Sequence, residues 1–312
     1  MKLKEFSIDT MTEREIKEHL ESSIYGKIPE RPEHLTDDHT KEDLEFGGGC
    51  GIVRDFSLIC TVGGSEISFP AKLVTPSRDG KYPTFIHIRY SNDNPDRALP
   101  LEEIVDHGYA VMTICASDIV KIGDKERSLF EKRLCPSRKK GNAPGSLALY
   151  AWAATRAMEF VCTRPYIDGK CIIALGQGIM ARVALLAAAF DERFSFVATV
   201  GHQYNYTNPG HISKKLFCPR FDGTISVGDE LLYSLCKARH IMLCETADGY
   251  FTDRDAEFKA LLSLKALSCD MPSEPCDISG KNLFYRYRTG SDVLCRKDML
   301  SFMDYIGKVR KM

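Results

Sequence analysis

The chain has 312 residues, of which 44% are hydrophobic and 27% charged, and its formal net charge at pH 7 is −1. This balance is typical of a globular protein that buries a large core without disulfide or metal staples. The near-zero net charge gives no indication of a nucleic-acid or membrane-surface partner. The short basic run Arg138–Lys140 lies in a polar stretch and is expected to be a solvated turn.

The first residues and the cysteines bear on the compartment. The amino terminus lacks the apolar core of a signal peptide, and no run of about 18 apolar residues is present. Twelve cysteines occur without a C-x-x-C pair, which disfavours zinc-ribbon and thioredoxin-like sites. We therefore expect a reduced, cytoplasmic protein without metal or cofactor. Five cysteines lie in apolar runs and are expected in the core: Cys60, Cys115, Cys162, Cys171 and Cys244.

The amino-terminal part is rich in charge. A helix is expected from about Thr12 to Ser22, followed by an irregular arm up to residue 45. The run Asp37–His39 in this arm is interpreted as solvated rather than metal-binding. Gly47–Gly49 marks a flexible boundary. We therefore divide the chain into an amino-terminal helix and arm, 1–45, that packs on a main domain, 46–312.

The main domain opens with a predicted hairpin and continues with alternating strands and helices. Two strand-like stretches, Gly51–Cys60 and Glu66–Val74, flank a turn at Gly63–Gly64. Apolar runs then alternate with helical patterns, which predicts an α/β fold: a mostly parallel central sheet with an amino-terminal antiparallel hairpin and helices on both faces. The expected strands are 84–88, 110–116, 171–175, 196–200, 240–244 and 283–287, and the expected helices are 101–107, 146–162, 179–190, 230–235, 253–267 and 298–309.

Residues 151–200 carry a resemblance to a known family. The phrases Thr163-Arg164-Pro165, Ile167-Asp168 and Asp191-Glu192-Arg193-Phe194 stand in order around a strand, a glycine turn and a helix. This arrangement resembles the nucleophile-elbow region of α/β-hydrolases of the acetyl-xylan-esterase-like and glucuronoyl-esterase-like branch. The resemblance extends over about residues 50–309 and implies an α/β-hydrolase fold with a sugar ester as substrate class.

The same resemblance implies that the catalytic positions are substituted. In this fold a serine on the elbow, an acid and a histidine follow one another along the chain. The serine position falls at Gly178, the accessory arginine at Ile179, the acid at about Gly201 and the histidine at Asp292. None of these residues supplies the expected nucleophile, oxyanion contact or base.

Other residues are candidates for a rebuilt or remodelled site. His202 follows the predicted strand 196–200; a structural histidine is the favoured interpretation, and the alternative is a partner of Asp292 in the cleft. Cys218 is a candidate displaced nucleophile, although packing is the favoured interpretation, and His87 is expected to be a core histidine. A glycine turn that opens a helix can also bind an anion. The ligand-binding candidates are thus Arg89, Tyr90, Gln177, Gly178, Ile179, His202 and Asp292.

Three hypotheses for function follow. The first is an esterase-like protein that has lost serine-hydrolase activity and keeps a cleft for a small, carbohydrate-derived ligand. The second is an active carboxylic or carbohydrate ester hydrolase with relocated catalytic residues. The third is a partner-binding protein that uses the charged arm in residues 1–45 as an interface; the sequence leaves the oligomeric state open.

Overall fold

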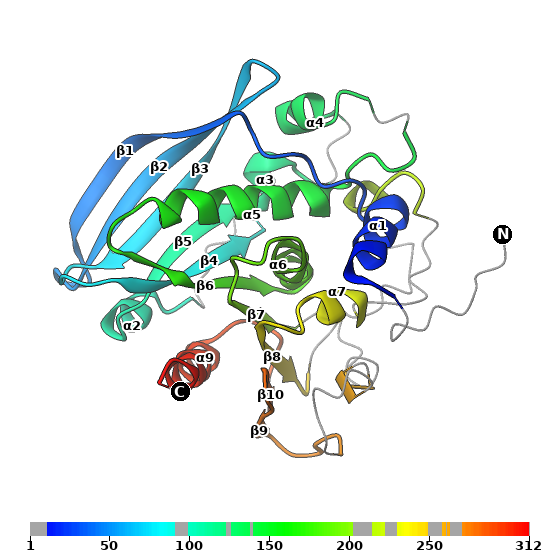
Figure 1. Cartoon of the computed structure of the whole chain (residues 1–312). Helices are drawn as coiled ribbons and strands as arrows, with labels where there is room; N and C mark the ends of the chain where they lie inside the picture. Colours follow the sequence, from blue (N-terminus) through cyan, green and yellow to red (C-terminus); the bar gives the residue numbers. More distant parts are fainter. Residues whose placement is uncertain are drawn as a thin grey trace.

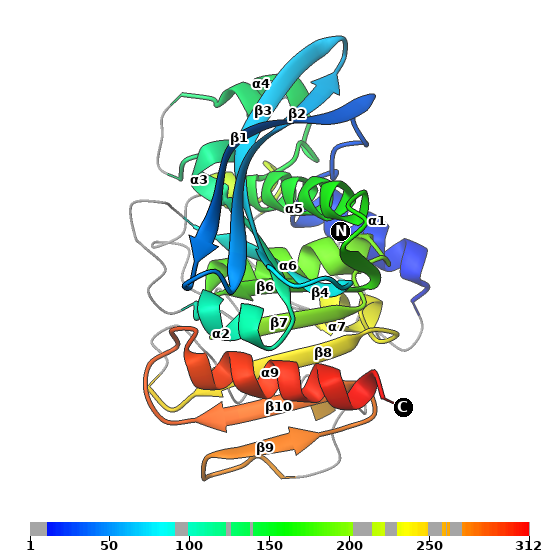
Figure 2. The same ribbon diagram turned by 90° about the vertical axis from the view of Figure 1, so that its left-hand side faces the viewer.

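The computed structural model describes residues 11–90, 99–122, 126–137, 140–201, 214–221, 230–248, 258–259, 261–262 and 270–311. Its centre is a sheet of ten strands in the order β1-β2-β3-β5-β4-β6-β7-β8-β10-β9 (Figures 1 and 2). The strands are β1 (His34–Phe46), β2 (Gly51–Val62), β3 (Ser65–Pro76), β4 (Tyr82–Arg89), β5 (Ala110–Cys115), β6 (Ile167–Gln177), β7 (Phe196–Val200), β8 (His240–Thr246), β9 (Cys276–Ser279) and β10 (Leu283–Arg288).

The sheet is parallel in its middle and antiparallel at its ends. Neighbouring strands from β5 through β4, β6, β7 and β8 to β10 run parallel. The amino-terminal strands β1, β2 and β3 are antiparallel, and so are the pairs β3–β5 and β9–β10. Since parallel strands share one carboxyl edge, the carboxyl ends of β4, β6, β7, β8 and β10 lie at the same side of the sheet.

Helices cover both faces of the sheet. One face carries α1 (Glu13–Ser23), α3 (Ala116–Ile119), α4 (Leu129–Leu134), α5 (Ser146–Cys162), α6 (Ile179–Phe190) and α7 (Glu230–Leu235) (Figure 1). The other face carries α2 (Leu101–Asp106) and α9 (Arg296–Val309). A short 3-10 helix, η2 (Lys214–Leu216), follows β7 in the chain. Each face has its own buried apolar cluster, as expected for a sheet covered on both sides.

The fold predicted from the sequence is confirmed. Each predicted strand of the main domain is present, and so are the predicted helices apart from 253–267, of which the structure describes four residues. The amino-terminal helix begins one residue later than expected, because Thr12 is its N-cap and forms a capping box with Glu15. Strand β9 and the short helices α3 and α4 were not anticipated.

The prediction of an irregular arm up to residue 45 is wrong for residues 34–45. Residues 34–46 form β1, which pairs with β2 and so continues the sheet across the expected division at residue 45. Most side chains of β1 are exposed, so no alternation of apolar and polar residues marks the strand. Its backbone hydrogen bonds to β2 maintain it, while its charged residues and two register shifts are features that protect sheet edges from pairing with other chains.

The run Asp37–His39 lies on this exposed strand and has protein partners. Asp37 accepts a hydrogen bond from Arg164 at 2.6 Å, and the His39 ring lies 5.1 Å from that of Phe56. The interpretation as a solvated run is therefore incomplete. Within the described residues, no group of three or more His, Cys, Asp and Glu side chains is placed to hold a metal ion. Arg138 and Lys139 lie outside the described residues.

The phrases that carried the resemblance belong to structural contacts. Arg164 pairs with Asp37 and lies over the Phe160 ring at 4.2 Å, which ties the end of α5 to β1. Arg193 bonds to Asp191 and reaches Glu159 on α5 at 2.8 Å. These ion pairs join segments far apart in the chain, so the phrases specify the packing of the scaffold.

The cysteines of the described chain have free thiols. Cys60, Cys115, Cys171 and Cys244 are buried as expected, and burial raises the pKa of Cys60 to about 12. Cys162 is exposed, which corrects its assignment to the core: it is the last residue of α5, where the helix reaches the surface. No described helix is both long and apolar enough to cross a lipid bilayer.

Candidate functional site

The turn between β6 and α6 has the geometry of a nucleophile elbow. Gly178 stands alone between the end of the strand and the start of the helix, with φ 57° and ψ −124°. Residues with a side chain adopt this conformation only under strain, whereas glycine adopts it freely. The Gly178 amide donates to the carbonyl oxygen of Val200 at 3.0 Å, which fixes the turn against the end of β7. The elbow is thus present, but it offers no side-chain atom that could attack an ester carbonyl.

The positions expected for the acid and for the histidine of a triad, Gly201 and Asp292, lie in contact with each other. Gly201 follows β7, has φ 58°, and donates its amide to the Cys244 carbonyl oxygen at 3.0 Å. A Cβ atom added at Gly201 would lie 2.4 Å from the Cβ atom of Asp292. Asp292 therefore occupies the space that a side chain at position 201 would need.

The loop that holds Asp292 is fixed by Arg288, a residue that sequence reasoning missed. Its guanidinium donates to the carbonyl oxygens of Ser291 at 2.9 Å and Val293 at 2.8 Å, and makes two bonds of 2.8 and 2.9 Å to the Asp298 carboxylate. The Leu294 amide donates to Gln177 Oε1 at 3.1 Å. This last bond ties the loop to the elbow, so the regions of Gly178, Gly201 and Asp292 are joined into one site.

Asp298 holds the Arg288 guanidinium group in place through two hydrogen bonds. It is fully buried at the start of α9 and also accepts a hydrogen bond from the Cys295 amide. Burial alone would raise the pKa of Asp298, but hydrogen bonds and charge from Arg288 outweigh burial and leave the pKa below its ordinary value. The sequence signal for the ion pair of Arg288 and Asp298 is limited to the spacing of Cys295 and Asp298, which fits the start of a helix.

Arg89 and Tyr90 lie at the same edge, beside the elbow. Arg89 ends β4, whose preceding residue Ile88 pairs with Gly176 of β6. The Tyr90 carbonyl accepts the Ser117 amide at 2.9 Å, and 41% of the residue is exposed. The edge therefore gathers a cation from β4, an amide from β6 and a carboxylate from the loop after β10.

None of the three candidates for a relocated catalytic residue is placed at the elbow by the described residues. His202 lies outside the described residues. Cys218 is 2% exposed, and its amide donates to the Ile24 carbonyl oxygen, so it is packed against the chain that follows α1. His87 is 2% exposed in the middle of β4, with Nδ1 3.4 Å from Thr113 Oγ1, as a core histidine is expected to be. Neither buried residue joins the elbow.

Comparison with known proteins shows where this architecture recurs. No protein-family model matches the chain. A glucuronoyl esterase from Solibacter usitatus superposes with a TM-score of 0.81 and 16% identity, over 95% of this chain and 91% of that one. A promiscuous CE15 esterase from a marine bacterial metagenome gives a TM-score of 0.79 and 17% identity, over 95% and 91% of the two chains.

One curated protein is also similar in sequence. It is Carbohydrate esterase MZ0003, from an unknown prokaryotic organism, with 21% identity over 236 residues. The match covers 66% of this chain and 54% of the relative, so this chain spans about half the length of that protein. The chain is therefore an α/β-hydrolase-fold protein, similar in architecture to glucuronoyl esterases.

Proposed function

We propose that this protein binds a small, carbohydrate-derived ligand at the carboxyl edge of its sheet and does not hydrolyse esters there. The observation that carries the proposal is Gly178. It holds the conformation of a nucleophile elbow without a hydroxyl or thiol. Serine hydrolases need an activated nucleophile at this turn.

The contact between Gly201 and Asp292 supports the same proposal. An acid after β7 would orient a histidine in a working triad. Here a side chain at position 201 would overlap Asp292, and Arg288 fixes the loop that holds Asp292. This loop therefore fills the space that an acidic side chain at position 201 would need, and it places a carboxylate rather than a histidine at position 292.

The ligand class follows from the charges at the edge and from the relatives. One solved relative, the Sporotrichum thermophile glucuronoyl esterase, has a variant whose structure contains methyl 4-O-methyl-β-D-glucopyranuronate. In this chain Arg89 and Asp292 supply one positive and one negative group, and Gln177 supplies an amide. Such groups suit the carboxylate or ester and the hydroxyls of a uronic acid.

The experiment combines turnover with binding. Purified protein is assayed on p-nitrophenyl acetate and on methyl glucuronate, and is then titrated with methyl glucuronate in a calorimeter. We expect turnover equal to buffer, saturable binding, and weaker binding for Arg89→Gln. Arg296→Gln, an exposed arginine paired with Glu103 on the α9 side, is the control. Turnover that survives repurification and a covalent adduct with a fluorophosphonate would contradict the proposal.

An active ester hydrolase with relocated residues is the second candidate. It is favoured by the position of Asp292, which lies against Gly201, the residue that precedes His202 in the chain. A histidine and a carboxylate are two members of a hydrolytic site. If the wild type turns over ester and His202→Ala abolishes that activity while Cys218→Ala does not, this candidate replaces the first.

The free thiols of the described residues support a reducing compartment, such as the cytoplasm, as the place of action.

A further inference from the structure

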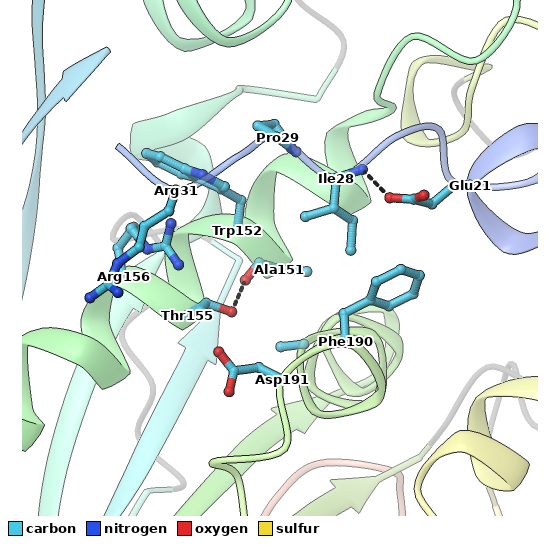
Figure 3. Close-up of a pocket in the computed structure, with 11 residues that line it drawn as sticks. Glu21, Ile28, Pro29, Arg31, Ala151, Trp152, Thr155, Arg156, Phe190 and Asp191 are labelled. Carbon is cyan, nitrogen blue, oxygen red and sulfur yellow. Dashed lines mark hydrogen bonds between the residues drawn. The ribbon is translucent and has the colours of Figure 1, made fainter. Parts of the chain in front are cut away.

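A cavity lies at the far end of α6 from the elbow. It has a volume of about 250 Å³ and is lined by residues from the end of α1, the chain that follows it, α5 and the end of α6 (Figure 3). Helix α6 has 12 residues, so it separates the cavity from Gly178 by about 18 Å. The cavity is thus distinct from the edge that holds Gly178, and a ligand bound in it is independent of the function proposed there.

The middle of the cavity is apolar. Ile28, Ala151, Trp152 and Phe190 line it, and Figure 3 shows Ile28 and Phe190 on one side and Trp152 on the other. Sites for drug-sized molecules measure about 300 to 1,000 Å³. The smaller volume here fits a ligand with a short apolar body.

One end of the cavity carries buried positive charge. Arg156 is 5% exposed and lies over the Trp152 ring at 5.3 Å. Its Nε atom is 2.9 Å from Glu159 Oε2, yet makes no hydrogen bond of acceptable geometry in the described structure. Burial lowers the pKa of Arg156, although the Glu159 carboxylate opposes this effect. A buried guanidinium group whose N–H lacks a well-aligned hydrogen bond is stabilised by a further anion.

The ion cluster around Arg156 contains three guanidinium groups and two carboxylates, while the cavity lining itself also holds the carboxylates of Glu21 and Asp191. Glu159 faces the guanidinium groups of Arg31 at 3.2 Å, Arg156 at 2.9 Å and Arg193 at 2.8 Å. Asp191 is bonded to Arg193 and supplies the second carboxylate. Two carboxylates thus serve three guanidinium groups, and two of these, Arg31 and Arg156, line the cavity.

We propose that this cavity binds a small monocarboxylate with a short aliphatic body, its carboxylate held by Arg156 and Arg31 and its carbon chain by Ile28, Trp152 and Phe190. Guanidinium groups bind carboxylates through charge-assisted hydrogen bonds. The carboxylate of the ligand bonds to the guanidinium groups of Arg31 and Arg156, and its carbon chain fills the apolar middle.

The test uses a built-in reporter. The chain contains one tryptophan, and it is Trp152, so intrinsic tryptophan fluorescence reports on this cavity alone. The full-length protein is titrated with hexanoate and, separately, with hexanamide, which has the same shape without the charge. Arg31→Gln removes an exposed cation of the cavity, and Ala187→Leu fills the cavity with a larger side chain. Arg296→Gln is the matched control, because it is similarly exposed and also paired with a glutamate.

We expect a saturable fluorescence change with hexanoate and none with hexanamide. Arg31→Gln should weaken binding about fivefold or more, in line with the loss of one charge-assisted bond. Ala187→Leu should abolish binding, and Arg296→Gln should leave it unchanged. The absence of a saturable change up to about 10 mM, an equal response to hexanamide, or unaltered binding in Arg31→Gln would each overturn the proposal.

Discussion

The two ends of helix α6 differ in what their residues provide. At its carboxyl end, Asp191 and Arg193 pair with each other, and Arg193 also pairs with the buried Glu159 of α5. At its amino end, Gly178 forms the turn of an elbow but provides no nucleophilic side chain. The comparison teaches that the phrases by which a sequence resembles a family can specify scaffold contacts. Their presence is therefore evidence for the fold, while the activity depends on other positions.

Substitutions in the ion pairs at the carboxyl end of α6 should reduce the free energy of unfolding more than substitutions at the elbow. Glu159→Gln removes the carboxylate shared by Arg31, Arg156 and Arg193, and leaves buried positive charge without its partner. We expect the free energy of unfolding to fall by about 3 to 5 kcal/mol, measured by urea denaturation. Glu18→Gln, which breaks the exposed pair with Arg14, is the control and should leave stability unchanged. An equal loss in both variants would show that the network does not anchor the fold.

At the elbow end, Gly201→Ala tests the contact with Asp292. The new methyl group combines an unfavourable positive φ with an overlap at 2.4 Å, so we expect a loss of about 3 kcal/mol. The double variant Gly201→Ala/Asp292→Gly should recover much of this loss, because it removes the overlapping side chain. Additive effects in the double-mutant cycle would mean that the two residues do not compete for space.

Gly178→Ser restores the hydroxyl of the elbow but should not restore activity. The conformation at φ 57° is strained for serine, so we expect a loss of about 2 kcal/mol in stability. Gly178→Ala should lose the same amount, since the cost is in the backbone. Turnover of p-nitrophenyl acetate is expected to stay at the level of buffer in both. Activity in the serine variant alone would show that a base is already in place.

The smallest effect should be on the pH dependence of stability. Burial opposes ionisation of Asp191 and Asp298, but bonds from Arg193 and Arg288 outweigh it and leave both pKa values below their ordinary values. The unfolded chain therefore binds more protons near pH 4, and stability falls as the pH falls. We therefore expect the free energy of unfolding to be lower at pH 4 than at pH 7. In Asp191→Asn, the free energy of unfolding, measured by urea denaturation at several pH values, should change less between pH 7 and pH 4. An unchanged pH dependence in this variant would show that Asp191 does not contribute to it.

The sequence predicted the layered fold well because its apolar runs are long and lie in a regular order. Strand β1 was missed because both of its faces are exposed, so its residues show no alternation. The roles of the site residues stay predictions. The positions of Gly178, Gly201 and Asp292 could be aligned from phrases along the chain, but the close approach of Asp292 to Gly201 is a spatial relation that spacing does not contain.

Arg288 could not be predicted as the organiser of the loop after β10. Its role depends on carbonyl groups of residues 289–293 and on Asp298, which converge on one guanidinium only in the folded chain. The same holds for Arg156, whose burial against Trp152 follows from the packing of the chain after α1 on α5. Charged residues are mostly exposed, so a sequence gives little reason to place either in the interior.

The contact between Gly201 and Asp292 also has an evolutionary consequence. A chain that acquired an acidic residue at position 201 would first meet a collision with Asp292, and only a second change at position 292 would relieve it. A single substitution at position 201 is then less stable than the starting point. A side chain at position 201 therefore requires a paired substitution at position 292.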